Sequence, residues 1–149
     1  MKVTADSIKK VREETGAGVM RVKQVLEEVE GDEAKALETL KKEGLEKVAK
    51  RESRQTGQGK LFTYNHHNQK IVSVVELFSE TDFVAKNELF ESLGKDIALQ
   101  VASMGAENVE DQDFIKDPSK KIKDKISEVI AKTGENIKLG RVVRIELGN

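Results

Sequence analysis

The 149-residue sequence has no cysteine, no tryptophan, a single proline and only 4% aromatic residues. The lack of cysteine excludes disulfides, thiolate metal sites and cysteine nucleophiles. The sequence also lacks an apolar run long enough to span a membrane, and it lacks the basic and then apolar N-terminus of a secretion signal. We therefore expect a soluble, cytoplasmic protein with a modest core built from Val, Leu, Ile and Ala.

An excess of one charge is also missing. The chain has 26 Lys and Arg against 27 Asp and Glu, which gives a net charge of −1. Affinity for a phosphate backbone depends on an excess of basic side chains that release counterions, so this balance argues against a nucleic-acid-binding protein. The basic stretch 41–60 leaves RNA binding open as a minor alternative, although it has too few aromatic residues for base stacking.

Residues 1–50 are predicted to form a three-helix domain. Thr4 and Asp32 are candidate caps of the first and third helices, "TGAG" (15–18) separates the first helix from the second, and Gly44 is expected to end the third. The apolar residues that recur at helical spacing are Ile8 and Val11, then Val19, Val22, Leu26 and Val29, then Ala34, Leu37 and Leu40.

Residues 45–59 have few apolar residues and could be a helical tail that runs into a flexible linker at 51–59. Residues 60–149 are predicted to form an α+β core domain. The extended pattern of 61–66 and 71–78 predicts an antiparallel hairpin, and helices are expected at about 87–103 and 121–132. The last stretch, "ENIKLGRVVRIELGN", predicts a strand that Gly140 interrupts. The expected fold is a three-helix bundle followed by a three-stranded antiparallel sheet packed with helices.

The sequence shows no convincing active site, metal site or cofactor site. His66 and His67 are the only histidines, and neighbours on a strand point to opposite faces, so a shared metal is not expected unless the strand ends between them. A local acidic cluster is formed by Glu76, Glu80, Asp82 and Glu88. Paired carboxylates can carry out acid–base chemistry, but a solvated face is the commoner interpretation. No phosphate-binding glycine loop is present.

One apolar pair is hard to explain by core building. In "SETDFVAKNE" (79–88), Phe83 and Val84 follow Glu80 and Asp82 where a strand is expected to pass into a helix. Phe83 either packs the helix entry against the sheet or is presented to a partner as an aromatic anchor with a polar rim. The sequence physics leaves both interpretations open.

Longer stretches carry a resemblance to a known family. The stretches are "TGAGVMRVKQVLEEVEGDEAKALETLKKEG", "YNHHNQKIVSVVELFSETDFVAKNELFESLGKDIA", "FIKDP" and "IAKTGENIKLGRVVRIELG". Together they resemble the elongation factor Ts family over nearly the whole chain, and "ETDFVAKNE" is the most specific of them. The first stretch is also similar to ubiquitin-associated three-helix domains.

The resemblance implies a guanine-nucleotide exchange factor that acts on the GTPase elongation factor Tu and is not itself an enzyme. It implies that Asp82 and Phe83 reach the GTPase near its magnesium and phosphate site, with Thr81 and Val84 shaping the turn. By the same resemblance the N-terminal domain docks on the GTPase, and we expect Val19, Met20 and Lys23 to make that contact.

Short members of the family dimerise, so a homodimer is also expected. A helical insertion expected between "ALQVASMGAENVE" and "QDFIKDP" is missing from this chain. The competing hypothesis is a non-catalytic adaptor that binds a peptide or a ubiquitin-like partner through its three-helix domain. That hypothesis would leave an exposed Phe83 without a role.

Overall fold

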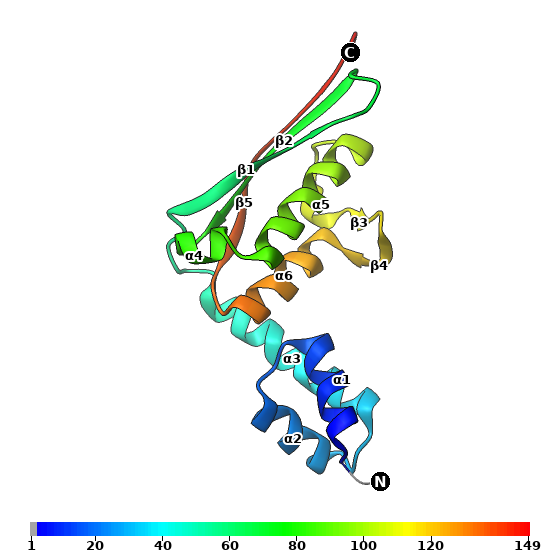
Figure 1. The fold of residues 1–149 in the computed structure, drawn as a ribbon, viewed down its shortest axis with the longest axis vertical. Helices are drawn as coiled ribbons and strands as arrows, with labels where there is room; N and C mark the ends of the chain where they lie inside the picture. Colours follow the sequence, from blue (N-terminus) through cyan, green and yellow to red (C-terminus); the bar gives the residue numbers. More distant parts are fainter. Residues whose placement is uncertain (1–2) are drawn as a thin grey trace.

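The computed structural model describes residues 3–149, which form an N-terminal helical bundle and an α+β core (Figure 1). The bundle consists of α1 (Ala5–Thr15), α2 (Val19–Glu28) and α3 (Glu33–Arg51). Thr4 and Asp32 cap α1 and α3 as predicted, because their side chains accept hydrogen bonds from the first-turn amides of Ser7 and Lys35. The buried residues of the bundle form a core of their own: Val11, Val22, Val25, Leu26, Ala36 and Leu40.

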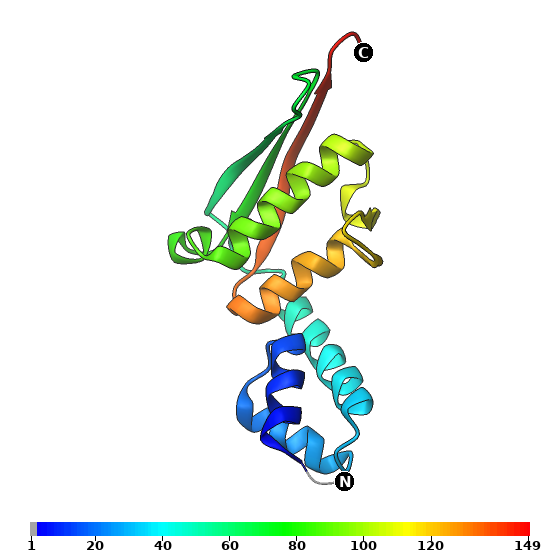
Figure 2. The same cartoon turned by 45° about the vertical axis from the view of Figure 1, so that its right-hand side comes forward.

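The prediction that Gly44 ends the third helix is wrong, because α3 continues to Arg51. A glycine inside a helix costs only about 1 kcal/mol, and the following residues favour a helix. Tertiary contacts also support the extension. Val48 packs against the core of the second domain, and the Arg51 guanidinium donates a hydrogen bond to the Ile130 carbonyl at 3.3 Å. One continuous helix therefore runs from the bundle to the core domain (Figure 2).

The segment expected to be a flexible linker is hydrogen bonded to the core. The side-chain amide of Asn136 donates to the carbonyls of Glu52 and Arg54 at 3.4 and 3.0 Å, and the Arg54 guanidinium donates to the Gly134 carbonyl at 3.4 Å. Only residues 52–57 lie between α3 and the first strand. The chain thus leaves the bundle along a defined path.

The core sheet confirms the predicted hairpin and closing strand. Its strands are β1 (Gln58–Asn65), β2 (Ile71–Ser79) and β5 (Ile137–Glu146), in the order β1-β2-β5 and all antiparallel. Helices α5 (Glu88–Met104) and α6 (Ile122–Thr133) lie on one side of this sheet, and the other side is left open (Figure 2). The buried core between them includes Phe62, Val75, Leu77, Phe90, Ile97, Val101, Ile126 and Ile130.

Leu139 does not share a face with Val143 and Ile145, although strict alternation along one strand would place all three on the same side. A bulge opposite Glu76 shifts the register of β5, so that Leu77 pairs with Leu139 and Val75 with Val142. Leu139 and Val142 consequently pack toward the core. Gly140 permits the bulge, since a Cβ there would lie 2.5 Å from atoms of Glu76 and Phe78.

Between α5 and α6 the chain makes a compact excursion. It contains a 3-10 turn, Val109–Asp111, and a small hairpin of β3 (Asp113–Phe114) and β4 (Asp117–Lys121). The fully buried Gln100 amide holds this hairpin, donating to the Asp113 carbonyl at 2.9 Å and accepting from the Ile115 amide at 3.0 Å.

None of the helices formed by residues 3–149 is both long and apolar enough to cross a membrane.

Candidate protein-binding site

The turn after β2 is a rigid platform that presents Phe83. Residues Asp82–Ala85 form the short helix α4, and Thr81 caps it by accepting a hydrogen bond from the Val84 amide at 3.3 Å. Val84 and Ala85 are 8% and 4% exposed and belong to the core of the second domain, whereas Phe83 is 82% exposed. The interpretation of Phe83 as a packing staple is therefore wrong, and its ring faces solvent.

Two residues from the α6–β5 loop fix this platform. The Thr81 amide and hydroxyl donate to the Glu135 carboxylate at 3.0 and 2.8 Å. In the opposite direction, the Asn136 amide donates to the Glu80 carboxylate at 2.8 Å. The turn is thus held by a loop more than 50 residues away in the sequence, and no local sequence pattern indicates this connection.

The acidic residues around the turn do not form one cluster. Asp82 is exposed and lies 3.9 Å from Lys86, whereas Glu80 lies 3.6 Å from Arg54. Glu76 faces Arg141 on the sheet, where side-chain and backbone hydrogen bonds from Arg141 hold the pKa of Glu76 below its ordinary value. The arrangement does not resemble a pair of carboxylates for acid–base chemistry.

The two histidines lie together after all, because β1 ends at Asn65 and both residues fall in the following turn. Their ring centroids are 4.1 Å apart, and the Tyr64 hydroxyl is hydrogen bonded to Nδ1 of His66 at 3.0 Å. Within residues 3–149 no group of three or more His, Asp or Glu side chains is arranged to bind a metal ion.

The second predicted surface lies at the start of α2. Val19 and Met20 are 43% and 76% exposed, and Lys23 is exposed one turn further along the helix. Arg21 pairs with Glu43 on α3, which fixes the orientation of α2 within the bundle. Figure 1 shows α2 and α4 on the same side of the molecule, with the end of α3 between them.

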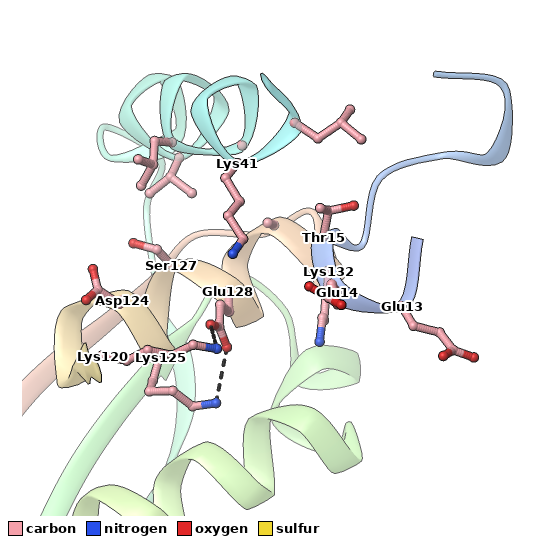
Figure 3. A pocket seen from close by; sticks show the side chains of 15 residues that line it. Glu13, Glu14, Thr15, Lys41, Lys120, Asp124, Lys125, Ser127, Glu128 and Lys132 are labelled. Atoms are coloured by element: carbon pink, nitrogen blue, oxygen red, sulfur yellow. Dashed lines mark hydrogen bonds and ion pairs between the residues drawn. The ribbon is translucent and has the colours of Figure 1, made fainter. Parts of the chain in front are cut away.

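A cavity of about 470 Å³ lies where α1 and α3 meet α6 (Figure 3). At its edge Lys120 and Lys125 pair with the Glu128 carboxylate at 2.6 and 3.1 Å. Burial by itself would raise the pKa of Glu128, but these two hydrogen bonds lower it below its ordinary value. Basic and acidic side chains are equal in number around the cavity, so it has no excess of positive charge to bind an anion. We interpret it as part of the boundary between the two domains.

Comparison with known proteins finds relatives of the segment that carries Phe83 and of the chain as a whole. Residues 80–149 match the family model described as "Elongation factor TS". Elongation factor Ts of Leptospira biflexa is 39% identical to the chain, and the alignment covers 99% of each protein. The chain belongs to the elongation factor Ts family. Elongation factor Ts of Thermosipho melanesiensis and that of Maridesulfovibrio salexigens are each 36% identical, with 98% and 99% of this chain covered.

The chain is shorter than these relatives. The alignment with the Leptospira biflexa protein is 196 residues long and the chain has 149, so at least 47 aligned positions have no counterpart here. A match over nearly the whole length of an elongation factor Ts does not favour the adaptor hypothesis.

Proposed function

We propose that the chain binds elongation factor Tu in its GDP-bound state and accelerates the release of GDP. A GTPase holds its nucleotide mainly through phosphate contacts and magnesium. A factor that displaces the elements making those contacts speeds release without any covalent step, so the proposed activity is not enzymatic. The coupling is reciprocal, because the factor and GDP each weaken the binding of the other.

The observation that carries the proposal is the environment of Phe83. Phe83 is 82% exposed on a short helix whose next two residues are buried. Its ring therefore contributes little to the stability of the fold. Exposed rings held on rigid elements are typical anchors of protein interfaces. We assign Phe83 as the wedge that enters the GTPase, Asp82 as its polar companion near the magnesium and phosphate site, and Thr81 and Val84 as the residues that shape the turn.

The N-terminal bundle is proposed to supply a second contact. Val19, Met20 and Lys23 are exposed on α2. That helix lies on the same side of the molecule as α4 (Figure 1). A second contact of this kind raises affinity without taking part in displacing the nucleotide. We therefore assign docking to the bundle and displacement to the turn.

A homodimer is also proposed. The sheet face without helices carries Leu61, Val143 and Ile145, which are 64%, 46% and 63% exposed. An apolar sheet face of this kind is a candidate for self-association, and a two-fold dimer would present two copies of Phe83. Since a translation factor acts where ribosomes work, the proposed location is the cytoplasm.

The test is the release of labelled GDP from purified elongation factor Tu, measured with and without the protein. We expect release to accelerate with increasing protein and to reach a plateau. Release at the unstimulated rate throughout would contradict the proposed function.

A further inference from the structure

We propose that Glu135 is a positioning residue for the exchange reaction. Its carboxylate fixes the turn that presents Phe83, and it is distinct from the residues assigned above to the contact with the GTPase. The inference rests on the proposed function of Phe83, and it names the part of the chain on which the placement of that ring depends.

The contact between Glu135 and Thr81 is the first support. The Thr81 amide donates to Oε1 of Glu135 at 3.0 Å, and the Thr81 hydroxyl donates to Oε2 at 2.8 Å. The same hydroxyl accepts from the Val84 amide and so caps α4. One carboxylate therefore orients the group that begins the helix carrying Phe83.

A second hydrogen bond, in the opposite direction, also attaches the Phe83 turn to the α6–β5 loop. The Glu80 carboxylate accepts from the Asn136 amide at 2.8 Å, so each of two adjacent loops donates a backbone amide to a carboxylate of the other. Asn136 is 2% exposed, which places this pair at the edge of the core. Two neighbouring hydrogen bonds running in opposite directions fix both the position and the orientation of the turn.

Glu135 is itself held in place by the end of α6. That helix ends at Gly134, whose left-handed φ of 77° turns the chain toward β5. The Thr133 hydroxyl donates to the Val129 carbonyl at 2.8 Å and accepts from the Glu135 amide at 3.4 Å. The carboxylate thus projects from a defined helix terminus and not from a free loop.

The turn needs this attachment because α4 has little stability of its own. A helix of four residues is far too short to persist without tertiary contacts. The burial of Val84 and Ala85 holds its far side, but the exposed Phe83 ring contributes no packing. Without Glu135, the start of α4 would sample several positions, and binding would have to restrict them again.

The test compares stimulated GDP release by Glu135→Ala in two backgrounds, the wild-type chain and Phe83→Ala. Loss of hydrogen bonds to a charged acceptor predicts a fall of about tenfold in the plateau rate in the wild-type background. In the Phe83→Ala background we expect a change of less than about twofold, because the two residues act as one unit. Glu135→Gln, which keeps an acceptor oxygen, should recover most of the rate.

Glu91→Ala is the matched control, because the Glu91 carboxylate pairs with Lys95 one turn along α5 and the change should leave the rate as in the wild type. If Glu135→Ala does not unfold cooperatively, Glu135→Asp, which keeps the charge but shortens the side chain by one methylene, should lower the rate for the same reason. An unchanged rate in a folded Glu135→Ala protein would overturn the inference, and so would an equal loss in both backgrounds.

Failure of the proposed function would be recognised separately. If Phe83→Ala alone exchanged GDP as fast as the wild type, the assignment of Phe83 would fall. Hydrogen exchange at the Val84 amide, which donates to the Thr81 hydroxyl at 3.3 Å, would then decide the inference by itself. Faster exchange in Glu135→Ala than in Glu91→Ala would support a positioning role, and equal exchange would overturn it.

Discussion

Gly94 on α5 lies directly against the ring of Phe62 on β1, and a Cβ at residue 94 would overlap the ring atoms Cδ2 and Cε2. Phe62 is itself 6% exposed and stacks at a tilt on Phe90, with 5.8 Å between ring centroids. The ring therefore cannot swing away without opening the core. A glycine in mid-helix, normally a weak point, sets the distance between helix and sheet here.

We predict that Gly94→Ala destabilises the core domain, because added volume in a packed core costs about 1–3 kcal/mol. Denaturant unfolding should show a lower midpoint with a similar slope. The matched control is Gly44→Ala on α3, where nothing lies within 4 Å of the added Cβ. That change should raise the free energy of unfolding by about 0.5–1 kcal/mol. Equal effects at both positions would contradict the packing argument.

These two glycines also show what sequence reasoning could and could not predict. The helix containing Gly94 was predicted because Phe90, Leu93, Ile97 and Val101 form a regular apolar stripe around it. The continuation of α3 past Gly44 stays only a possibility in the sequence, because its support comes from the second domain, through Val48 and Arg51. Local periodicity thus predicted the elements, whereas tertiary contacts decided where α3 ends.

The candidate site divides in the same way. The exposed Phe83 was singled out because an aromatic ring beside acids is unusual in a turn. Glu135 is not singled out, because nothing local links it to Thr81. An interruption of the last strand at Gly140 is predicted, but the register shift there is not, for a similar reason. Both depend on which segments meet in space, information that a single sequence does not contain.

Phe83→Ala should reduce stimulated GDP release by about 30-fold, the loss expected for removal of an aromatic anchor worth about 2 kcal/mol. The free energy of unfolding should hardly change, since the side chain is 82% exposed. Met104→Ala removes another exposed apolar side chain, at the far end of α5, and serves as the control. Wild-type release by a folded Phe83→Ala protein would contradict the assignment.

Met20→Asp should weaken docking and leave displacement intact. Because Met20 is 76% exposed at the start of α2, a charge there should not destabilise the bundle. We expect the concentration that gives half-maximal GDP release to rise about tenfold, with the plateau rate unchanged. A lower plateau at unchanged half-maximal concentration would contradict the assignment of docking to the bundle and of displacement to the turn.

Ile145→Asp should shift the protein from dimer to monomer, because a carboxylate on an apolar face cannot be buried without a large cost. Sedimentation velocity at micromolar concentration measures the change directly. Leu45→Asp, on an exposed position of α3 away from the sheet, is the control and should leave the sedimentation coefficient as in the wild type. A wild-type protein that is monomeric at these concentrations would refute the proposed dimer.

The Glu128 carboxylate should make stability depend on pH. Its pKa is lowered in the folded protein, so its contribution is present above the ordinary value of 4.5 and is lost as the pH falls through the lower folded value. We expect Glu128→Gln to flatten this acid limb of the stability curve relative to the wild type. Superimposable curves below pH 5 would show that the contacts with Lys120 and Lys125 do not favour the charged carboxylate.

Because α3 is continuous, it sets the distance and the angle between the bundle and the core domain. One end of the helix belongs to the bundle, and the other is hydrogen bonded through Arg51 to the end of α6, so the two proposed contact surfaces are carried at a set spacing and angle. Each residue added to a helix advances it by about 1.5 Å and turns it by about 100°. A single insertion near Gly44 would therefore aim Met20 in a different direction from Phe83 while every contacting side chain stayed the same. Selectivity for the partner then depends on the phase of a helix as well as on the residues at its two ends.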